Sequence, residues 1–429
     1  MLEPLRINRN THAPIVEYCQ ILNYCSENYG TPISPRLRLE NEVLTKLEGL
    51  YSSVLTDTMF IISEGKVHAS PSSNTYNVMH FQRDYMDIPE GVLKEKGKVR
   101  RNKEVRRRVD REYPNFINSM YSLWGEYNGR KTIGSVSPWL EPVEGMVNVK
   151  GEPLMVIRPR YEIKEDDATF RITTSEPNLQ GLSTMYKEEF ILPEEGRLLV
   201  GADISSQEPN IFFNSLCRDE DILRMYQEVG EIYAPVVAKI ENIPVEEVDR
   251  ELRNSYKEGI LSKMNAGGTF LLQTKMGSYE LASKLINFID NNPNYAQFKE
   301  KINRQLMTPN PRMGGFIKGW ERVLKTKDRG FNKLANAPLQ ITAICFFSIS
   351  FFAFCQKMME KVGDWETLEE FLVDVRPIYH AHDEIVLSIA DKNGYPEVAR
   401  ECLKWALEVH FEDWVPFKAE PYVSDIYIH

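Results

Sequence analysis

The stretch RLLVGADI, from Arg197 to Ile204, decides the fold, because it contains a clear strand signal and ends beside a carboxylate. Its apolar residues predict a short buried strand with Asp203 at the carboxyl end. Farther along, PIYHAHDEIVLSI, from Pro377 to Ile389, predicts two short strands around an acidic turn. Strands that are separated by a largely helical insertion predict an α+β fold, with a helical lobe inserted into a small sheet.

The segment between these strands carries the signals of the helical lobe and of a long core helix. Residues 210–300 are predicted to be mostly helical, and residues 309–315 mark a loop. Pro338 can open the apolar helix that follows it. The uncharged run Ile341–Cys355 has 15 residues, fewer than the ~18–20 that a membrane span needs, so we expect a buried helix.

The composition is that of an ordinary globular protein. The chain has 429 residues and 42% hydrophobic content, enough for two or three subdomains. Six cysteines without a CxxC pair, and a beginning without an apolar leader, indicate a reduced, intracellular protein without a membrane partner. The net charge of −10 argues mildly against nucleic-acid binding, but phosphate affinity depends on where the cations lie.

Residues 94–111, KEKGKVRRNKEVRRRVDR, form a basic run with ten Lys or Arg against three acids. Its good helix formers predict that the run is helical in part. For an isolated charge run, a solvated face is the default interpretation.

Two aspartates at strand ends are the first candidates for chemistry. Asp203 ends the first predicted strand, and Asp383 lies in the acidic turn 180 residues later. Either one alone is most often a turn former. Together they could bind Mg²⁺, a hard cation that takes carboxylate oxygens, and two such ions clamp the oxygens of an in-line displacement. Only the fold could bring these residues together.

A helix with spaced cations is the second candidate. In RNSYKEGILSKMN, Arg253, Lys257, Leu261 and Asn265 recur every four residues and therefore lie along one helix face. Two cations followed by an apolar side chain could bind a triphosphate and then a base. A surface helix with ordinary charge decoration is the alternative interpretation.

Five segments, in matching order and spacing from about 165 to 390, resemble the motifs of DNA polymerase family A, the bacterial polymerase I family. The SQEP form of the second segment resembles a bacteriophage subset of that family. The resemblance covers the polymerase region only, and it implies a right-hand fold with palm, fingers and thumb. The segments are TFRITTSEPNLQGL (169–182), ADISSQE (202–208), RNSYKEGILSKMNA (253–266), NAPLQ (336–340) and HDE (382–384).

The resemblance implies two-metal nucleotidyl transfer to a primer 3′-hydroxyl. Asp203 and Asp383 correspond to the two metal-binding carboxylates, and the backbone carbonyl of Ile204 would complete the coordination. The implied cofactor is a pair of Mg²⁺ ions, for which Mn²⁺ can substitute. Glu384 corresponds to a neighbouring catalytic carboxylate that assists.

The resemblance also implies a deoxynucleoside triphosphate site. Arg253 and Lys257 correspond to the pair that binds the triphosphate, and Lys257 could protonate the leaving pyrophosphate. Leu261 and Tyr233 fall at further nucleotide-contacting positions. Glu208 corresponds to a steric gate, a side chain packed against the sugar C2′ that rejects a 2′-hydroxyl.

Primer–template DNA is the implied partner. Every Watson–Crick pair offers minor-groove acceptors, so donors such as Arg171 and Gln340 could check pair shape without reading sequence. The basic run 94–111 lies where the family has its thumb, and its cations would contact duplex phosphates. The residues at primer–template positions are Arg171, Gln180, Asn336, Gln340 and His382.

Several positions depart from the family pattern. The finger helix has Leu261 where Phe or Tyr is usual, and a leucine cannot stack on a base as an aromatic ring does. These departures leave the metal and cation pairs intact and put nucleotide affinity, fidelity and rate in doubt. The other departures are Ser206 for Gln, Asn210 for Arg, Tyr233 for His, Asn265-Ala266 for Tyr-Gly, and Asn332 for Arg.

The resemblance assigns an N-terminal segment and thumb to residues 1–165, palm to 166–215, fingers to 216–330 and palm again to 331–429. Only 170 residues precede Arg171, which leaves no room for a proofreading exonuclease beside a thumb. We therefore expect no 3′–5′ exonuclease and no 5′ nuclease in this sequence. A separate exonuclease, a helicase or a processivity factor are the partners this implies.

The leading hypothesis is a template-directed DNA polymerase of replication or repair, phage-encoded and working in the bacterial cytoplasm. The atypical finger helix keeps open a specialised polymerase for lesion bypass, gap filling or RNA templates. A non-catalytic DNA-binding replisome subunit is the alternative from another class, and Asp203, Asp383, Arg253 and Lys257 together argue against it. Glu208 disfavours a single-subunit RNA polymerase, because it sits where a ribose must fit.

Overall fold

The computed structural model describes residues 3–38, 133–163, 170–182, 184–324 and 330–428, and the backbone of 66–67 and 74–75. The basic run 94–111 lies outside the described residues. The chain divides into two compact units, of which the first comprises Met1–Pro32, Pro142–Gln180 and Ile191–His429. The second comprises Ile33–Glu141 and Gly181–Phe190. Every residue proposed for the site belongs to the first unit, and the predicted domain boundaries stay predictions.

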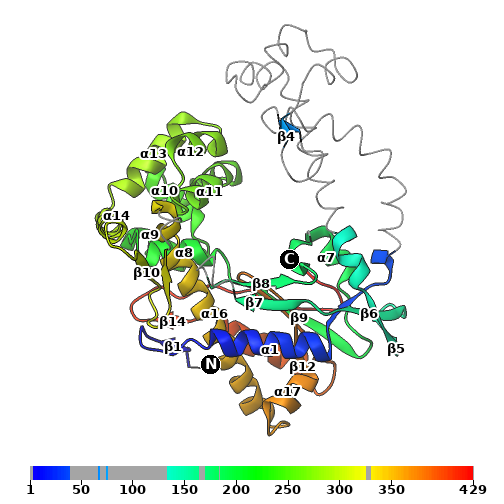
Figure 1. Ribbon diagram of the computed structural model, residues 1–429. Coiled ribbons are helices and arrows are strands. Elements are labelled where there is room, and N and C mark those ends of the chain that lie inside the picture. Colours follow the sequence, from blue (N-terminus) through cyan, green and yellow to red (C-terminus); the bar gives the residue numbers. More distant parts are fainter. Residues whose placement is uncertain are drawn as a thin grey trace. The chain divides into compact units, whose positions relative to one another are not determined.

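A four-stranded antiparallel sheet, of order β12-β13-β9-β15, forms the centre of the first unit (Figure 1). The stretch RLLVGAD forms β9, and the two strands around the acidic turn are β12 and β13, so both strand predictions are confirmed. The strands are β9 (Arg197–Asp203), β12 (Val375–Ala381), β13 (Glu384–Ala390) and β15 (Tyr422–Ser424).

The order of this sheet follows from its side chains. Every residue of β13 is buried, which suits a strand with a neighbour on each side. In β9, Gly201 lies opposite Tyr422 of β15, and a Cβ there would come within 2.3 Å of the tyrosine ring. A glycine is therefore required where the aromatic ring crosses the strand.

Three helices complete the core around the sheet: α1 (Ile15–Asn28), α16 (Ala337–Val362) and α18 (Tyr395–Leu407). Pro338 lies in the first turn of α16, where its missing N–H costs nothing, so the predicted start is confirmed. Within the described part of the chain, one helical stretch, Phe331–Val362, is long and apolar enough to cross a membrane, and 83% of its most apolar window is buried inside the molecule. It is the expected buried helix.

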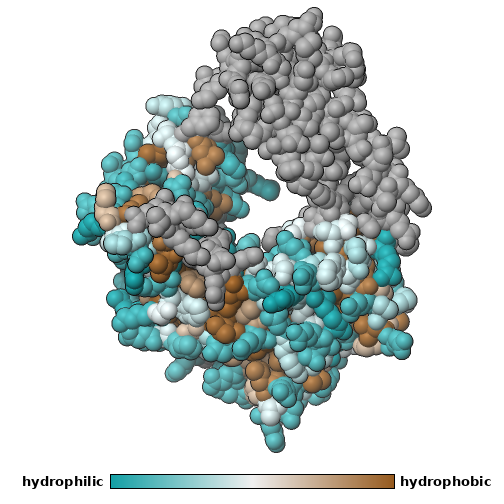
Figure 2. All heavy atoms as spheres, viewed as in Figure 1, coloured by the Kyte–Doolittle hydropathy of each residue, from teal (hydrophilic) through white to brown (hydrophobic). Residues whose placement is uncertain are grey.

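The helical lobe lies between β9 and α16, and it too is confirmed. Four of its helices begin at side chains that cap free backbone N–H groups, namely Asp219, Asp249, Ser278 and Asn292. In Figure 2 the described surface is largely hydrophilic with scattered hydrophobic residues. The lobe consists of α8 (Gln207–Asn214), α9 (Glu220–Val229), α10 (Tyr233–Glu241), α11 (Arg250–Met264), α12 (Thr269–Met276), α13 (Tyr279–Asp290) and α14 (Pro293–Leu306).

Smaller elements connect these parts. The paired strands are β1 (Arg6–Ile7) with β14 (His410–Phe411), β3 (Lys66–Val67) with β4 (Asn74–Thr75), β7 (Arg160–Ile163) with β8 (Ile172–Ser175), and β10 (Arg312–Gly314) with β11 (Glu321–Val323). A three-stranded sheet has the order β2 (Thr31–Ile33), β6 (Pro153–Ile157), β5 (Glu141–Val147). The short helices are α7 (Thr184–Phe190), α15 (Phe331–Ala335), α17 (Leu368–Asp374), and the 3-10 turns Ser137–Trp139, Leu179–Gly181 and Val245–Glu247.

Candidate active site

Two carboxylates from distant parts of the chain meet at the end of the sheet. The backbone N–H of Ile204, the residue after Asp203, donates to the carbonyl of Asp383 at 3.1 Å. A two-residue turn, His382 and Asp383, joins β12 to β13, with His382 in the left-handed region at φ 56°. The pairing of β13 with β9 therefore places the two aspartates side by side.

The electrostatics of this pair favour a bound cation. Burial, followed by the charge of Asp383, raises the pKa of Asp203. Burial is also the main cause that raises the pKa of Asp383, and the charge of Glu208 adds to it. Two buried carboxylates side by side cannot both stay ionised unless a shared proton or a cation compensates their charge. The oxygen donors fit a hard divalent ion such as Mg²⁺.

The donor set is small. Among the residues that the structure describes, no three His, Cys, Asp or Glu side chains gather as a metal-binding group. The predicted set of Asp203, Asp383 and the backbone carbonyl of Ile204 therefore relies on two side chains. A site of this kind suits Mg²⁺, which usually keeps several waters and takes one or two carboxylates together with substrate phosphates.

A cavity of about 480 Å³ opens in front of the aspartates. This volume falls in the range of small-molecule sites, ~300–1,000 Å³. The cavity lies between one end of the sheet and the helical lobe, since residues of β9, α8, α10, α11 and α16 contribute to its walls. Ten residues predicted for the site line it: Arg171, Asp203, Glu208, Tyr233, Arg253, Lys257, Leu261, Gln340, His382 and Asp383.

Tyr233 forms a platform for the two cations of α11. The Arg253 guanidinium carbon and the Lys257 Nζ lie 5.3 and 5.5 Å from the centre of its ring. Arg253 Nε also pairs at 3.1 Å with Glu231, whose carboxylate accepts the backbone N–H groups at the start of α10. Burial raises the pKa of Tyr233 to about 12, so its hydroxyl stays neutral. The tyrosine thus orients both cations by stacking.

Arg171 and Glu208 form an ion pair on the cavity wall. Arg171, the predicted primer contact, is therefore paired with Glu208, the predicted sugar gate. Glu208 lies in the first turn of α8, and Arg171 directly precedes β8. Their side chains are 23% and 36% exposed, so both are accessible to a ligand.

The remaining predicted DNA contacts differ in their surroundings. The Gln180 amide donates to the carbonyls of Ile172 and His380, at 3.1 and 2.8 Å, and it does not line the cavity. Asn336 joins α15 to α16, and its buried Oδ1 has no hydrogen-bond partner among the described residues. Gln340 lines the cavity, and its buried Oε1 likewise has no partner in the described part of the chain. Orphaned buried acceptors of this kind mark places where a ligand or a water completes the hydrogen bonding.

His380 is a cavity residue that the motifs did not identify. It is fully buried, its Nδ1 lies 3.1 Å from the Tyr18 hydroxyl of α1, and its Nε2 has no partner among the residues that the structure describes. It lines the same cavity as His382. A sequence signal existed, because it stands two residues before His382 in a predicted strand, and alternate strand residues share a face.

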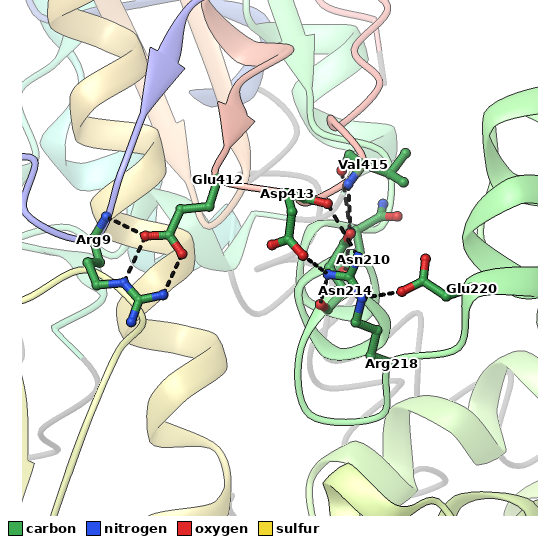
Figure 3. A network of polar contacts seen from close by, with 8 residues as sticks. All are labelled: Arg9, Asn210, Asn214, Arg218, Glu220, Glu412, Asp413 and Val415. Atoms are coloured by element: carbon green, nitrogen blue, oxygen red, sulfur yellow. Dashed lines mark hydrogen bonds and ion pairs between the residues drawn. The ribbon is translucent and has the colours of Figure 1, made fainter.

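A polar network fixes the helix that follows Asp203 (Figure 3). Asn210, at the position where the family usually has Arg, donates to the carbonyls of Ser205 and Ser206 at 2.8 and 3.1 Å. Asn214 exchanges hydrogen bonds with the backbone of Val415 at 2.8 and 3.3 Å. The loop that contains Val415 is also joined to Arg218 through Asp413 and to Arg9 through Glu412 (Figure 3). The turn after Asp203 is therefore restrained from the C-terminal side.

Comparisons with known proteins identify the family of this chain. The model of DNA polymerase family A matches residues 155–427. DNA polymerase I of Pseudomonas aeruginosa is 25% identical over 244 residues, 52% of this chain and 25% of that protein. The thermostable DNA polymerase I of Thermus aquaticus is 28% identical over 274 residues, 59% of this chain and 30% of that protein. The chain therefore spans between a quarter and a third of these relatives.

A solved structure shares the fold. The POL domain of Pol1 from M. smegmatis, in complex with DNA primer–template and dNTP, superimposes with a TM-score of 0.66 at 16% identity. The match covers 96% of this chain and 70% of that one. The predicted α+β polymerase fold is confirmed by this likeness.

Proposed function

This chain belongs to DNA polymerase family A, and from that membership we propose that it extends a primer 3′-hydroxyl with deoxynucleoside triphosphates on a DNA template. One observation carries the proposal: the Asp203–Asp383 pair and the Arg253–Lys257 pair line the same cavity. Nucleotidyl transfer needs this combination, because negative charge must be neutralised both at the reacting phosphoryl group and along the leaving pyrophosphate.

The carboxylate pair would hold two Mg²⁺ ions, or Mn²⁺ in their place, with the backbone carbonyl of Ile204 as a further ligand. Bound ions of this kind activate the attacking hydroxyl and neutralise charge on the leaving oxygens. The protein contributes a preformed pair of acidic side chains, one from β9 and one from the β12–β13 turn. The raised pKa values of both aspartates support this assignment, because a divalent cation offsets the burial and the repulsion from nearby carboxylates that raise them.

The cations of α11 would bind and orient the triphosphate. Arg253, restrained by Glu231 and stacked near Tyr233, presents a fixed guanidinium, which suits bidentate contact with phosphate. Lys257 lies near Asp203 and is the candidate acid that protonates the leaving pyrophosphate. Leu261 lines the same cavity farther along the helix face and would pack on the base.

Glu208 would exclude ribonucleotides. Its position on the cavity wall and its ion pair with Arg171 support a side chain fixed against the sugar. Gln340, His382 and Arg171 would contact primer–template DNA from the same cavity, and the orphaned Oε1 of Gln340 supports such a ligand. Gln180, which donates to two main-chain carbonyls, would act by bracing β8 against β12.

Primer extension tests the proposal. Wild-type protein with Mg²⁺ and a DNA template should extend a primer with dNTPs and not with rNTPs, and Asp383→Ala should abolish extension. Asp391→Ala is the matched control, because Asp391 is an exposed aspartate just beyond the other end of β13. Wild-type protein that binds primer–template but does not extend it would contradict the proposal and favour a non-catalytic DNA-binding role.

Leu261 supports a second candidate function, a polymerase specialised for damaged or RNA templates. An aliphatic side chain on the cavity wall constrains the base less than a stacked ring would. Extension across an abasic site, or on an RNA template, at a rate near that on intact DNA would establish this function. No extension on either template would exclude it.

A further inference from the structure

Glu384 stands directly opposite Asp203 in the register of β13 and β9. Side chains of directly paired residues lie on one face of a sheet with Cβ atoms ~4.5–5.5 Å apart, and like charges in that position repel. Yet Glu384 does not line the cavity that contains Asp203 and Asp383. Some other contact must direct its carboxylate elsewhere.

One partner of Glu384 is Tyr427, near the C-terminal end. The Tyr427 hydroxyl donates a hydrogen bond to Glu384 Oε1. Both residues are buried, at 1% exposure for the tyrosine and 6% for the glutamate. A buried carboxylate depends strongly on such a donor, because water cannot replace it.

Asp203 also lines a second cavity, of about 600 Å³. Glu384, Tyr422 and Ile428 line this cavity together with Asp203. Asp203 therefore lines both cavities, and Glu384 faces the one that lacks Asp383. The orientation of the Glu384 side chain thus decides how many carboxylates face the nucleotide.

The C-terminal segment also supports the Asp203 turn through its backbone. The N–H of Ser205 donates to the carbonyl of Lys418 at 3.1 Å, and Ile204 forms a β-bridge with Ala419. β15 then pairs with β9 directly beside the turn. Residues 418–427 therefore contact both the main chain of the turn after Asp203 and the side chain of Glu384.

We propose that Tyr427 is a positioning residue of the polymerase centre, which holds the Glu384 carboxylate out of the nucleotide cavity, so that Asp203 and Asp383 are the only two of these three neighbouring carboxylates that face the cation site. The proposal rests on the proposed function, in which these two aspartates bind the cations. The resemblance implied that Glu384 assists catalysis; in this proposal it is instead a carboxylate that is kept away from the cation site, and the C-terminal segment is a working part of the centre.

Tyr427→Phe tests the proposal, because it removes the hydroxyl and keeps the ring. We expect kcat for nucleotide incorporation to fall about tenfold with KM for dNTP nearly unchanged, since a hydrogen bond to a buried charge is lost. Tyr395→Phe is the matched control: Tyr395 is also buried and donates to a carboxylate, that of Asp364, which does not line either cavity. The control should keep wild-type kcat. A Tyr427→Phe kcat within about twofold of wild type would overturn the proposal.

A double-mutant cycle shows whether Tyr427 acts through Glu384. In the Glu384→Gln background the side chain is uncharged and no longer repels Asp203, so Tyr427→Phe should change kcat less than about twofold. The same tenfold loss in both backgrounds would show that Tyr427 acts independently of Glu384 and would overturn the proposal.

Manganese binding gives a readout that needs neither nucleotide nor DNA. In Tyr427→Phe the released Glu384 would add a third carboxylate, so we expect Mn²⁺, followed by electron paramagnetic resonance, to bind at least about threefold more tightly. Unchanged affinity would overturn the proposal. Should Tyr427→Phe fail to fold, Glu384→Ala replaces it: affinity within about twofold of wild type is expected, and a tenfold loss would identify Glu384 as a ligand instead.

The two proposals fail in different ways. A wild-type protein that extends no primer contradicts the proposed function. The Mn²⁺ titration of Tyr427→Phe still decides whether Tyr427 restrains Glu384.

Discussion

At the scale of single residues, the ion pair between Arg171 and Glu208 combines two roles that separate motifs suggested. Glu208 is expected to exclude the 2′-hydroxyl, and Arg171 is expected to contact the primer end. Because the two side chains are paired on one cavity wall, movement of either affects the other. Sugar selection and primer contact are therefore expected to be coupled in this protein.

Glu208→Ala should lower the preference for dNTPs over rNTPs by about 10- to 100-fold, because the atoms that would clash with a 2′-hydroxyl are removed. The ratio of kcat/KM values in single-nucleotide extension measures this preference. Glu220→Ala is the control: Glu220 also lies in a first helical turn and pairs with an arginine, Arg218 at 2.6 Å, but it is outside the cavity. An unchanged preference in Glu208→Ala would exclude the gate.

Lys257→Ala should lower the single-turnover incorporation rate by about 100-fold, because general acid catalysis contributes ~10²–10⁴-fold. Lys263 on the same helix pairs with Asp290 at 3.0 Å, and it does not line the cavity. Lys263→Ala should therefore stay near the wild-type rate. Equal losses in the two variants would assign the effect to the helix and not to the cation.

At the scale of elements, the contacts between strands and their neighbours place the site. β9 carries Asp203, but its position depends on β15, whose Tyr422 ring lies over Gly201. Likewise β12 carries His380 into the cavity wall, and α1 contributes the Tyr18 hydroxyl beside it. Both contacts join segments that lie far apart in the sequence.

Gly201→Ala should destabilise the protein by about 1–3 kcal/mol, because the new methyl would lie 2.3 Å from the Tyr422 ring. Urea unfolding measures this loss. In a Tyr422→Ala background the same substitution should cost less than about 0.5 kcal/mol, because the ring is absent. Equal costs in both backgrounds would show that crowding by Tyr422 is not the cause.

His380 should make stability depend on pH. Burial, with the nearby charge of His382, lowers the pKa of His380 to about 3 in the folded chain, whereas an unfolded histidine has a pKa near ~6.5. Below pH ~6.5 the unfolded state binds a proton that the folded state does not, so this contribution destabilises the protein as pH falls towards 3. Between pH 7.5 and 5, wild type should lose about 2 kcal/mol more stability than His380→Gln. Urea unfolding at both pH values measures the difference, and equal losses would contradict the assignment.

At the scale of the whole molecule, an acidic protein is proposed to bind DNA. The net charge is −10, so contact with phosphates must come from local cations. The basic run 94–111 is the densest such group in the sequence, and it lies outside the described residues. Its contact with duplex DNA stays a prediction.

Replacing Arg106, Arg107 and Arg108 by alanine should reduce the slope of log K against log salt by about 2–3, because each lost phosphate contact removes ~0.9 from the slope. Fluorescence anisotropy of a labelled primer–template at several salt concentrations measures it. The control replaces Lys357, Lys361 and Arg400, which pair with acids on α16 and α18. Equal changes in both triple variants would mean that net charge, and not the basic run, governs binding.

The sequence by itself determined the local elements and the identity of most cavity residues. The strand that ends on Asp203, the acidic turn at Asp383, the face of α11 and the buried helix that starts near Pro338 all depend on near neighbours along the chain. Periodicity and local propensity report such neighbours directly. The family motifs then identified ten residues that the structure places around one cavity.

Only the tertiary structure decided which side chains pair and which way they face. Asp203 meets Asp383 across 180 residues, Glu208 pairs with Arg171, and Gln180 donates to the backbone of β12. Glu384 shows the limit most clearly: it adjoins Asp383 in the sequence, yet it faces Tyr427 and a different cavity. The physical reason is that a side chain's orientation is set by partners on distant segments, and no local pattern encodes them.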